Sequence, residues 1–124
     1  MKAQDLMIGD WVQDLSPVII DAISNEDICT YKCKDGYITA NPSNLRPIPL
    51  TPEILEKNGF EKRISDYWVL EVVGEREYNV VAWKPQIFLQ IQFTNGDLSW
   101  TNCRYVHELQ HALKLCGIEK DIEL

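Results

Sequence analysis

The sequence lacks any long apolar run. No stretch of its 124 residues approaches the roughly 18 consecutive apolar residues that mark a membrane-spanning helix. The opening segment, Met1 to Asp5, also lacks the apolar region that a secretory signal contains. We therefore expect a cytoplasmic protein with no membrane partner.

An excess of basic residues is absent as well. The chain carries 12 Lys and Arg against 19 Asp and Glu, which gives a formal net charge of −7. A negative chain repels phosphate backbones, so we expect no nucleic-acid partner. The acidic residues are spread along the chain rather than gathered in dense runs, which argues against mimicry of DNA.

Cysteine is too sparse and too poorly spaced for a disulfide or zinc framework. Cys29 and Cys33 lie in a predicted strand, where residues four apart are separated by roughly 13 Å. Cys116 belongs to an apolar helical stripe, in which a thiol acts as a small hydrophobic group. We expect all four cysteines to be reduced. The chain also offers no phosphate-binding glycine loop and no assignable serine or cysteine nucleophile.

The first third of the chain predicts short strands. Apolar or β-branched runs occupy residues 8–12, 18–23 and 28–33, and Asp35-Gly36 predicts a hairpin turn before residues 38–40. The first run, Ile-Gly-Asp-Trp-Val, is similar to the first strand of many SH3-like barrels. We expect residues 1–48 to form a small β-rich, SH3-like subdomain.

Four prolines between residues 41 and 52 mark the joint between subdomains, and we expect them to keep the backbone extended and unpaired. Thr51 and Pro52 are suited to the N-cap and first position of a helix, and Gly59 is suited to ending it. The pattern predicts a two-turn helix anchored by Ile54, Leu55 and Phe60.

The remaining chain predicts an antiparallel meander closed by a helix. Strands are expected at residues 67–73, 78–83, 87–93 and 98–101, with turns at 74–77, 84–86 and 95–96. A helix is expected between residues 102 and 116, ended by Gly117. Its stripe of Val106, Leu109, Leu113 and Cys116 should pack on one face of the meander, formed by Trp68, Leu70, Val72, Ile87, Leu89, Ile91, Phe93, Leu98 and Trp100. The predicted fold is α+β, with residues 49–124 as an α-β-β-β-β-α subdomain that forms one compact unit with residues 1–48.

The opposite face of the meander is a candidate binding surface. Aromatic side chains beside amides are common in protein contact sites. Packing against the N-terminal subdomain would explain the same composition, so both interpretations stay open. The candidate residues are Tyr67, Val69, Trp83, Phe88, Gln90 and Gln92.

Both histidines of the chain lie in one motif, because His107, Glu108 and His111 spell H-E-x-x-H. On a helix the two imidazoles lie one turn apart on one face, where they can bind Zn²⁺ while the glutamate activates a water. This motif defines the alternative function, a zinc-dependent metallopeptidase or hydrolase.

Three observations argue against the zinc site. Helical periodicity places His107 and His111 about 160° from the centre of the apolar stripe, so we expect them to face solvent. The extended motif needs a glycine and a third histidine where Lys114 and Gly117 stand. Cys103 would extend the helical row of histidines, but it would lie about 12 Å from His111. We therefore predict no enzymatic activity and no cofactor, with zinc required only under the alternative.

A resemblance spans nearly the whole chain. It is carried by Asp5-Leu6, Ile8-Gly9 and Val12 at the start, Pro47-Ile48-Pro49-Leu50-Thr51 with Leu55 and Gly59-Phe60, and Tyr105-Val106-His107 with Leu109-Gln110. With these motifs the chain resembles a family of small proteins from gut Bacteroidetes and their phages or mobile elements. The resemblance implies no activity. Because the family pattern Y-V-H-x-L-Q does not require Glu108 or His111, it implies a capping or contact role for His107. Our hypothesis is a non-enzymatic accessory protein, encoded by a phage or mobile element, that binds another protein.

Overall fold

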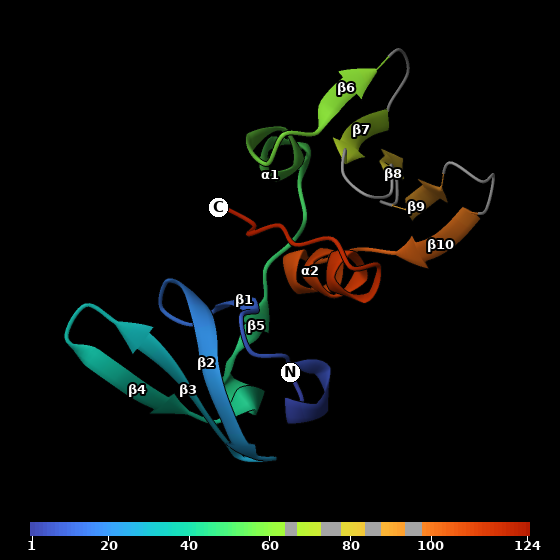
Figure 1. Cartoon of the computed structure of the whole chain (residues 1–124). Coiled ribbons are helices and arrows are strands. Elements are labelled where there is room, and N and C mark those ends of the chain that lie inside the picture. The colour runs from blue at the N-terminus through green and yellow to red at the C-terminus, as the bar shows by residue number, and fades with distance from the viewer. Residues whose placement is uncertain (64–66, 73–77, 84–87, 94–97) are drawn as a thin grey trace. The chain divides into compact units, whose positions relative to one another are not determined.

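The fold is α+β, as predicted. The computed structural model describes residues 1–63, 67–72, 78–83, 88–93 and 98–124, which contain two five-stranded antiparallel sheets, a short α-helix and a C-terminal α-helix (Figure 1). The chain divides into two compact units. Unit 1 comprises Met1–Pro49 with Tyr105–His111, and unit 2 comprises Leu50–Arg104 with Ala112–Leu124. The predicted boundary after residue 48 lies one residue from the observed division, but residues 105–111 belong to unit 1.

Unit 1 is built on a sheet with the strand order β4-β3-β2-β1-β5. Its β1 strand pairs antiparallel with both β2 and β5. A 3-10 helix, η1 (Ala3–Asp5), precedes the sheet, and a second one, η2 (Pro42–Asn44), joins β4 to β5. The strands are β1 (Trp11–Gln13), β2 (Pro17–Asn25), β3 (Ile28–Cys33), β4 (Gly36–Ala40) and β5 (Arg46–Pro47).

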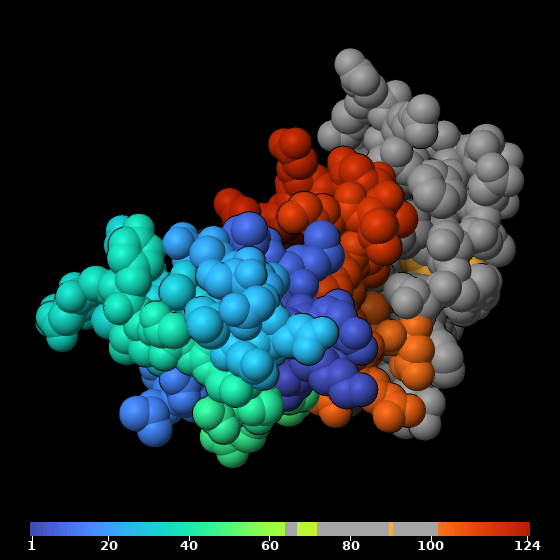
Figure 2. Space-filling view, turned by 90° about the horizontal axis from the view of Figure 1, so that it is seen from below, coloured from blue at the N-terminus to red at the C-terminus, as the bar shows by residue number. Residues whose placement is uncertain are grey.

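Two predictions for these strands need adjustment. The first strand begins at Trp11 rather than at residue 8, because Gly9 adopts a φ of 96° and Asp10 N–H donates to the Met7 carbonyl in a turn. The β3–β4 hairpin is confirmed, but Cys33 pairs with Gly36. The turn residues are therefore 34 and 35, one position earlier than predicted. The hairpin stands out from the rest of unit 1 (Figure 2).

The prediction that the prolines exclude regular pairing was wrong for Pro47. This residue pairs with Val12, and Arg46 pairs with Gln13. Proline is tolerated there because β5 lies at the edge of the sheet, where one side of the strand needs no ladder donor. The preceding η2 begins after Asn41, whose side chain accepts a hydrogen bond of 3.0 Å from the backbone N–H of Ser43.

The core of unit 1 lies on one face of this sheet. The Tyr31 hydroxyl donates to the Asp14 carboxylate. This bond, together with burial, raises the pKa of Tyr31 to about 12, so the phenol stays protonated at neutral pH. The buried apolar side chains that form the core are Leu6, Val12, Val18, Ile20, Cys29, Tyr31 and Leu45.

Unit 2 begins with α1 (Pro52–Lys57), which forms as predicted. Thr51 Oγ1 accepts a hydrogen bond of 3.3 Å from the backbone N–H of Ile54, and Pro52 occupies the first helical turn. Asn58 caps the C-terminus, and Gly59 follows with a φ of 88°. Of the three predicted anchors, Leu55 and Phe60 are buried, and Ile54 is half-buried.

The meander of unit 2 has one strand more than predicted. Its order is β10-β9-β8-β7-β6, with every neighbouring pair antiparallel. The additional strand, β6, is wholly exposed and polar, so it lacks the apolar alternation that identifies a strand. The predicted turns at 74–77, 84–86 and 95–96 lie outside the described residues. The strands are β6 (Glu61–Arg63), β7 (Tyr67–Val72), β8 (Tyr78–Trp83), β9 (Phe88–Phe93) and β10 (Leu98–Asn102).

The backbone register corrects the predicted phase of β10. Leu98 pairs with Gln92 and Trp100 pairs with Gln90, so both lie in line with the set predicted for the opposite face. The phase of so short a strand depends on the connection that precedes it, and a shift of one residue moves every side chain to the other face. On β7, Trp68 and Leu70 are buried as predicted.

The C-terminal helix, α2 (Val106–Leu115), begins four residues later than the predicted segment. It ends at Leu115, one residue before the predicted end. Gly117 terminates it as predicted, with a φ of 73°, and Ile118 N–H donates to the Leu113 carbonyl at 2.9 Å. Val106 to His111 belong to unit 1, and Ala112 to Leu115 belong to unit 2. Only the last turn of α2 therefore belongs to the same compact unit as the meander.

The chain after α2 is anchored within unit 2. Ile118 and Ile122 are buried. The Asn58 side chain donates to the Glu123 carbonyl and accepts from the Glu123 N–H, both at 2.7 Å. Cys103 precedes α2, so the expected helical row with the histidines does not form. All four cysteines lie in the described part of the chain, and no disulfide joins them.

Candidate binding pocket of the N-terminal unit

The first turn of α2 is fixed by contacts within unit 1. Glu108 Oε1 accepts a hydrogen bond of 3.1 Å from the backbone N–H of Tyr105. This is the arrangement in which a glutamate at the third helical position satisfies the backbone at the N-cap. Val106 N–H donates to the Ile48 carbonyl at 2.8 Å. Two of the backbone N–H groups that a helix start leaves unpaired, those of Tyr105 and Val106, are thus satisfied, and these bonds fix the turn that carries His107.

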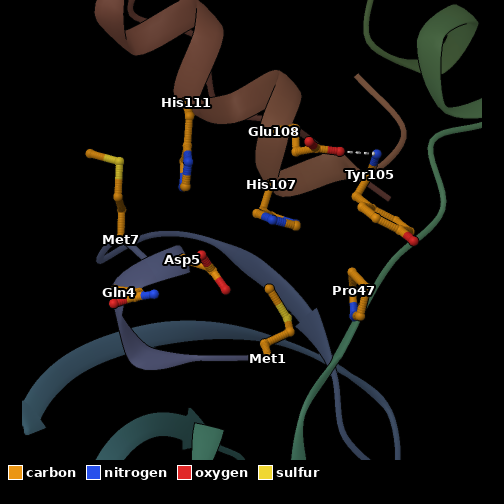
Figure 3. A pocket seen from close by; sticks show the side chains of 9 residues that line it. All are labelled: Met1, Gln4, Asp5, Met7, Pro47, Tyr105, His107, Glu108 and His111. Atoms are coloured by element: carbon orange, nitrogen blue, oxygen red, sulfur yellow. Dashed lines mark hydrogen bonds between the residues drawn. The ribbon is translucent and has the colours of Figure 1, made fainter. Parts of the chain in front are cut away.

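The prediction that both histidines face solvent was wrong. His107 is only 7% exposed. The His111 side chain is 24% exposed. In Figure 3 both side chains point from α2 toward the N-terminal segment that carries Gln4, Asp5 and Met7. The helix therefore buries a polar face in addition to its apolar stripe.

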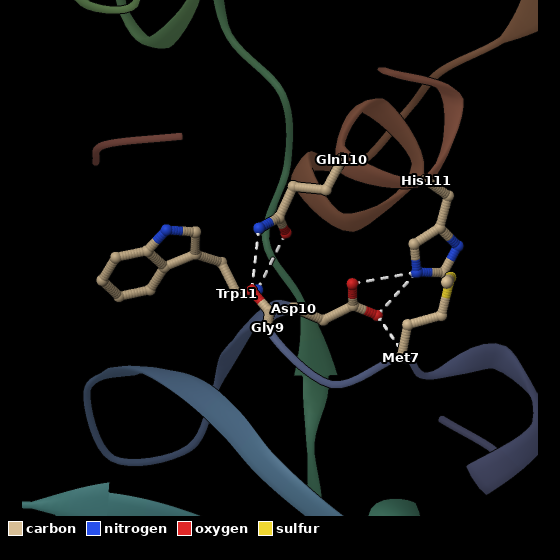
Figure 4. A network of polar contacts seen from close by, with 6 residues as sticks. All are labelled: Met7, Gly9, Asp10, Trp11, Gln110 and His111. Atoms are coloured by element: carbon tan, nitrogen blue, oxygen red, sulfur yellow. Dashed lines mark hydrogen bonds and ion pairs between the residues drawn. The ribbon is translucent and has the colours of Figure 1, made fainter. Parts of the chain in front are cut away.

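Asp10 is the centre of a polar network on this face (Figure 4). It is 2% exposed, and its two carboxylate oxygens lie 2.9 and 2.7 Å from His111 Nε2. Because a carboxylate only accepts, His111 Nε2 carries the proton. The same carboxylate accepts a hydrogen bond of 2.8 Å from the Met7 N–H. Asp10 thereby holds the turn before β1 against α2.

Gln110 adds a second clamp beside this pair. Its Oε1 accepts from the Trp11 N–H at 2.9 Å, and its Nε2 donates to the Gly9 carbonyl at 2.9 Å. One side-chain amide therefore binds a backbone N–H and a backbone carbonyl of a segment about 100 positions earlier in the chain (Figure 4). Together, Gln110 and His111 fix residues 7–11.

His107 lies beside this network. Its ring stacks on Tyr105, with centroids 5.9 Å apart and planes at 12°, and meets His111 edge-on at 5.5 Å. Burial lowers the pKa of His107, and the nearby Asp10 carboxylate opposes that effect. The imidazole is therefore neutral at pH 7. Its Nδ1 is buried and has no hydrogen-bond partner among the described residues.

These histidines line an open pocket of about 560 Å³ within unit 1 (Figure 3). Two thioethers, a proline and a tyrosine ring supply apolar wall, and two carboxylates and an amide supply polar groups. Such a combination of apolar wall and a few polar groups is typical of a ligand site. The lining residues are Met1, Gln4, Asp5, Met7, Pro47, Tyr105, His107, Glu108 and His111.

The contacts made by the H-E-x-x-H residues differ from those that zinc catalysis needs. His111 directs Nε2 to Asp10, and Glu108 directs a carboxylate oxygen to the Tyr105 backbone. Within the described residues, no three His, Cys, Asp or Glu side chains are grouped to hold a metal ion. His107 is the motif residue whose buried polar atom is left unsatisfied.

The residues predicted on the meander face are only partly described. Tyr67 and Val69 are half-buried, and Gln90 is 5% exposed. Trp83 pairs with Tyr67 on one side and Phe88 on the other. The side chains of Trp83, Phe88 and Gln92 lie outside the described part. The burial of Gln90 argues against an open surface at that position.

Sequence reasoning missed most of the pocket. It assigned chemistry only to His107, Glu108 and His111. Asp5, Pro47 and Tyr105 entered through the resemblance alone, and Asp10, which supports the pocket through His111, was given no role. The contact between Asp10 and His111 joins residues 101 positions apart. No sequence pattern links the acidic residues of the N-terminal segment to α2. The local signals are the H-E-x-x-H motif and the Tyr105-Val106-His107 motif.

Comparison with known proteins gave no relatives: no protein-family model, curated protein or solved structure matches the chain. In the part of the chain that the structure describes, no helix has the length and apolar character needed to cross a membrane.

Proposed function

We propose that the protein is a non-enzymatic binding module, and that the pocket of unit 1 holds a short segment of a partner protein. The observation that carries the proposal is a formed pocket in which one buried polar atom has no hydrogen-bond partner among the described residues. His107 lines an open pocket, is 7% exposed, and has a buried Nδ1 without a partner among the described residues. A buried polar atom without a partner needs an explanation, and a ligand group supplies one.

The wall of the pocket suits a protein segment. Met1 and Met7 bring flexible, polarisable side chains that adapt to different partners. Tyr105 brings an aromatic ring, a residue type that is enriched at protein interfaces. The turn that carries Met7 is fixed by Asp10, so part of the site is preorganised before binding.

The topology of unit 1 supports the proposal by analogy. A five-stranded antiparallel sheet whose first strand pairs with both the second and the fifth is the arrangement of SH3-like barrels. We propose that unit 1 is SH3-like. Small barrels of this kind include peptide-binding domains, although a shared fold alone does not define a function. Membership of the Bacteroidetes family, a mobile-element origin and a cytoplasmic location stay predictions.

The alternative remains a zinc-dependent hydrolase. It is favoured by two imidazoles that lie one turn apart and line the same pocket. It requires His111 to exchange Asp10 for the metal and Glu108 to leave its capping position. Elemental analysis after zinc exposure and extensive dialysis separates the two functions. One zinc per chain, lost in His107→Ala, would favour the hydrolase and count against the binding module.

Peptide display tests the binding module directly. We would select random 12-residue peptides on the purified full chain and measure the affinity of the enriched sequences. Gln4→Trp places a bulky ring at the pocket, whereas Glu26→Trp places the same ring at an exposed position between β2 and β3. We expect binding to be lost in Gln4→Trp and retained in Glu26→Trp. Failure to enrich peptides, or equal binding to both variants, would refute the proposal.

A further inference from the structure

The polar side chains of the pocket supply mainly hydrogen-bond acceptors. Asp5 brings a carboxylate from η1, and Glu108 brings one from the first turn of α2 (Figure 3). His107 adds a buried Nδ1 that has no partner among the described residues, and this atom accepts in one neutral tautomer and donates in the other. The two carboxylates favour a ligand that brings N–H or O–H donors, because an ionised carboxylate only accepts.

The charges of the pocket favour a cation. Among the described residues that line it, none is Lys or Arg, and the N-terminal ammonium of Met1 donates to the Leu45 carbonyl at 3.2 Å. The buried His107 ring is neutral at pH 7, so it does not offset the carboxylates of Asp5 and Glu108. The whole chain carries a net charge of −7, which attracts a basic segment over a longer range.

The shape of the wall favours a planar cation. The rings of Tyr105 and His107 lie within 12° of parallel and form a stacked aromatic pair. A guanidinium stacks on aromatic faces, carries five donors and loses its hydration more readily than an ammonium. The methylene stem of such a side chain suits the thioethers of Met1 and Met7.

We infer that the pocket binds an arginine side chain of the partner segment, through the carboxylates of Asp5 and Glu108 and the aromatic pair of Tyr105 and His107. This inference rests on the proposed function, because it names the group that the pocket recognises. The same contacts favour arginine over an acidic or purely apolar segment. A lysine satisfies the charge but not the stacking or the number of donors.

A titration with matched small probes tests the inference. We would add N-acetyl-arginine N-methylamide to the ¹⁵N-labelled full chain and follow backbone amide shifts by NMR. The matched probes are the citrulline amide, which keeps the planar shape without the charge, and the lysine amide, which keeps the charge without the plane. We expect saturable shifts at Asp5 and at residues 105–111, with citrulline weaker by about tenfold or more. Equal affinity for arginine and citrulline would overturn the inference, and so would tighter binding of lysine.

Two conservative variants separate charge from structure. Glu108→Gln keeps an acceptor for the Tyr105 N–H while removing the charge, and Asp5→Asn does the same for its contact with Lys2. We expect the double variant to weaken arginine binding about tenfold. Glu26→Gln, an exposed change in the same unit, should leave it unaltered. Unchanged binding in the double variant would refute the role of the carboxylates.

The outcome for the inference can be told from the outcome for the proposed function. Displayed peptides that bind in the pocket without arginine would leave the binding module intact and refute the arginine assignment. If display enriches no pocket-dependent peptide, the binding module itself fails, whatever the small probes do. Enriched peptides that share one arginine, lose affinity on its replacement by citrulline, and fail to bind Gln4→Trp would support both.

Discussion

Replacing Asp10 by alanine tests the network that positions the pocket. Asp10 is 2% exposed and accepts hydrogen bonds from His111 Nε2 and from the Met7 N–H. The substitution removes both acceptors at once and leaves two donors facing a small cavity. Because the Met7 turn and α2 both line the pocket, the change is expected to lower stability and ligand affinity together.

The size of the effect follows from the two contacts. A hydrogen bond to a charged group contributes about 1.5–3 kcal/mol, and the His111 side chain is 24% exposed, so water partly replaces the lost partner. The bond from Met7 is also only part-buried and adds about 1 kcal/mol. We expect Asp10→Ala to lower the free energy of unfolding by about 3 kcal/mol, which corresponds to a fall in Tm of about 10 °C.

A double-mutant cycle measured by urea unfolding isolates the central pair. We would compare wild type, Asp10→Ala, His111→Ala and the double variant, and follow circular dichroism and tryptophan fluorescence. The expected coupling free energy between the two side chains is about 1.5 kcal/mol. Asp21→Ala, an exposed change on β2, is the control for loss of a negative charge. A coupling below about 0.5 kcal/mol, the level at which distant sites behave independently, would refute the structural role of the pair.

Two further predictions concern His107 and α1. Because burial lowers the pKa of His107, the unfolded chain binds a proton at this residue more readily than the folded chain does. Its contribution to stability is therefore complete above a pH of about 6.5 and declines as the pH falls below that value. Urea midpoints at pH 7.5 and 5.5 should differ less in His107→Phe than in wild type, and an equal difference would contradict the assignment. Thr51→Ala removes the side-chain acceptor for the Ile54 N–H and should cost about 1 kcal/mol, whereas Thr51→Ser should cost less. A loss no larger than that of the exposed Thr39→Ala would show that the cap does not stabilise α1.

Elements with local signals were predictable from the sequence. Thr51-Pro52 and Asn58-Gly59 set the bounds of α1 because capping involves residues within one turn of each end. The β3 strand, Ile28–Cys33, was predicted to the residue because its composition is rich in β-branched, aromatic and apolar side chains. The exposed β6 strand had no such signal. It pairs with β7 through backbone hydrogen bonds, and a polar, exposed sequence gives no pattern from which this pairing can be predicted.

The pocket was predictable only in its helical part. Periodicity identified three of the four residues of the apolar stripe, since Val106, Leu109 and Leu113 are buried, whereas Cys116 is half-buried and follows the end of α2. It could not identify the second face, because the side chains of that face are polar and contact the Asp10 carboxylate rather than apolar residues. A helix that buries polar side chains against a distant segment resembles, from sequence alone, a helix that exposes them.

The position at which α2 begins decides what Glu108 can do. Because the helix starts at Val106, Glu108 lies in its first turn and accepts the Tyr105 N–H. A helix that started near Asn102, as predicted, would place Glu108 in its second turn, away from any unpaired backbone N–H of the helix start. Its carboxylate would then be available to a water between the two histidines, as the H-E-x-x-H motif requires. A shift of four residues in the helix start thus changes the position of this glutamate from the one that the zinc alternative needs for a general base to that of a helix cap, while the motif itself stays the same.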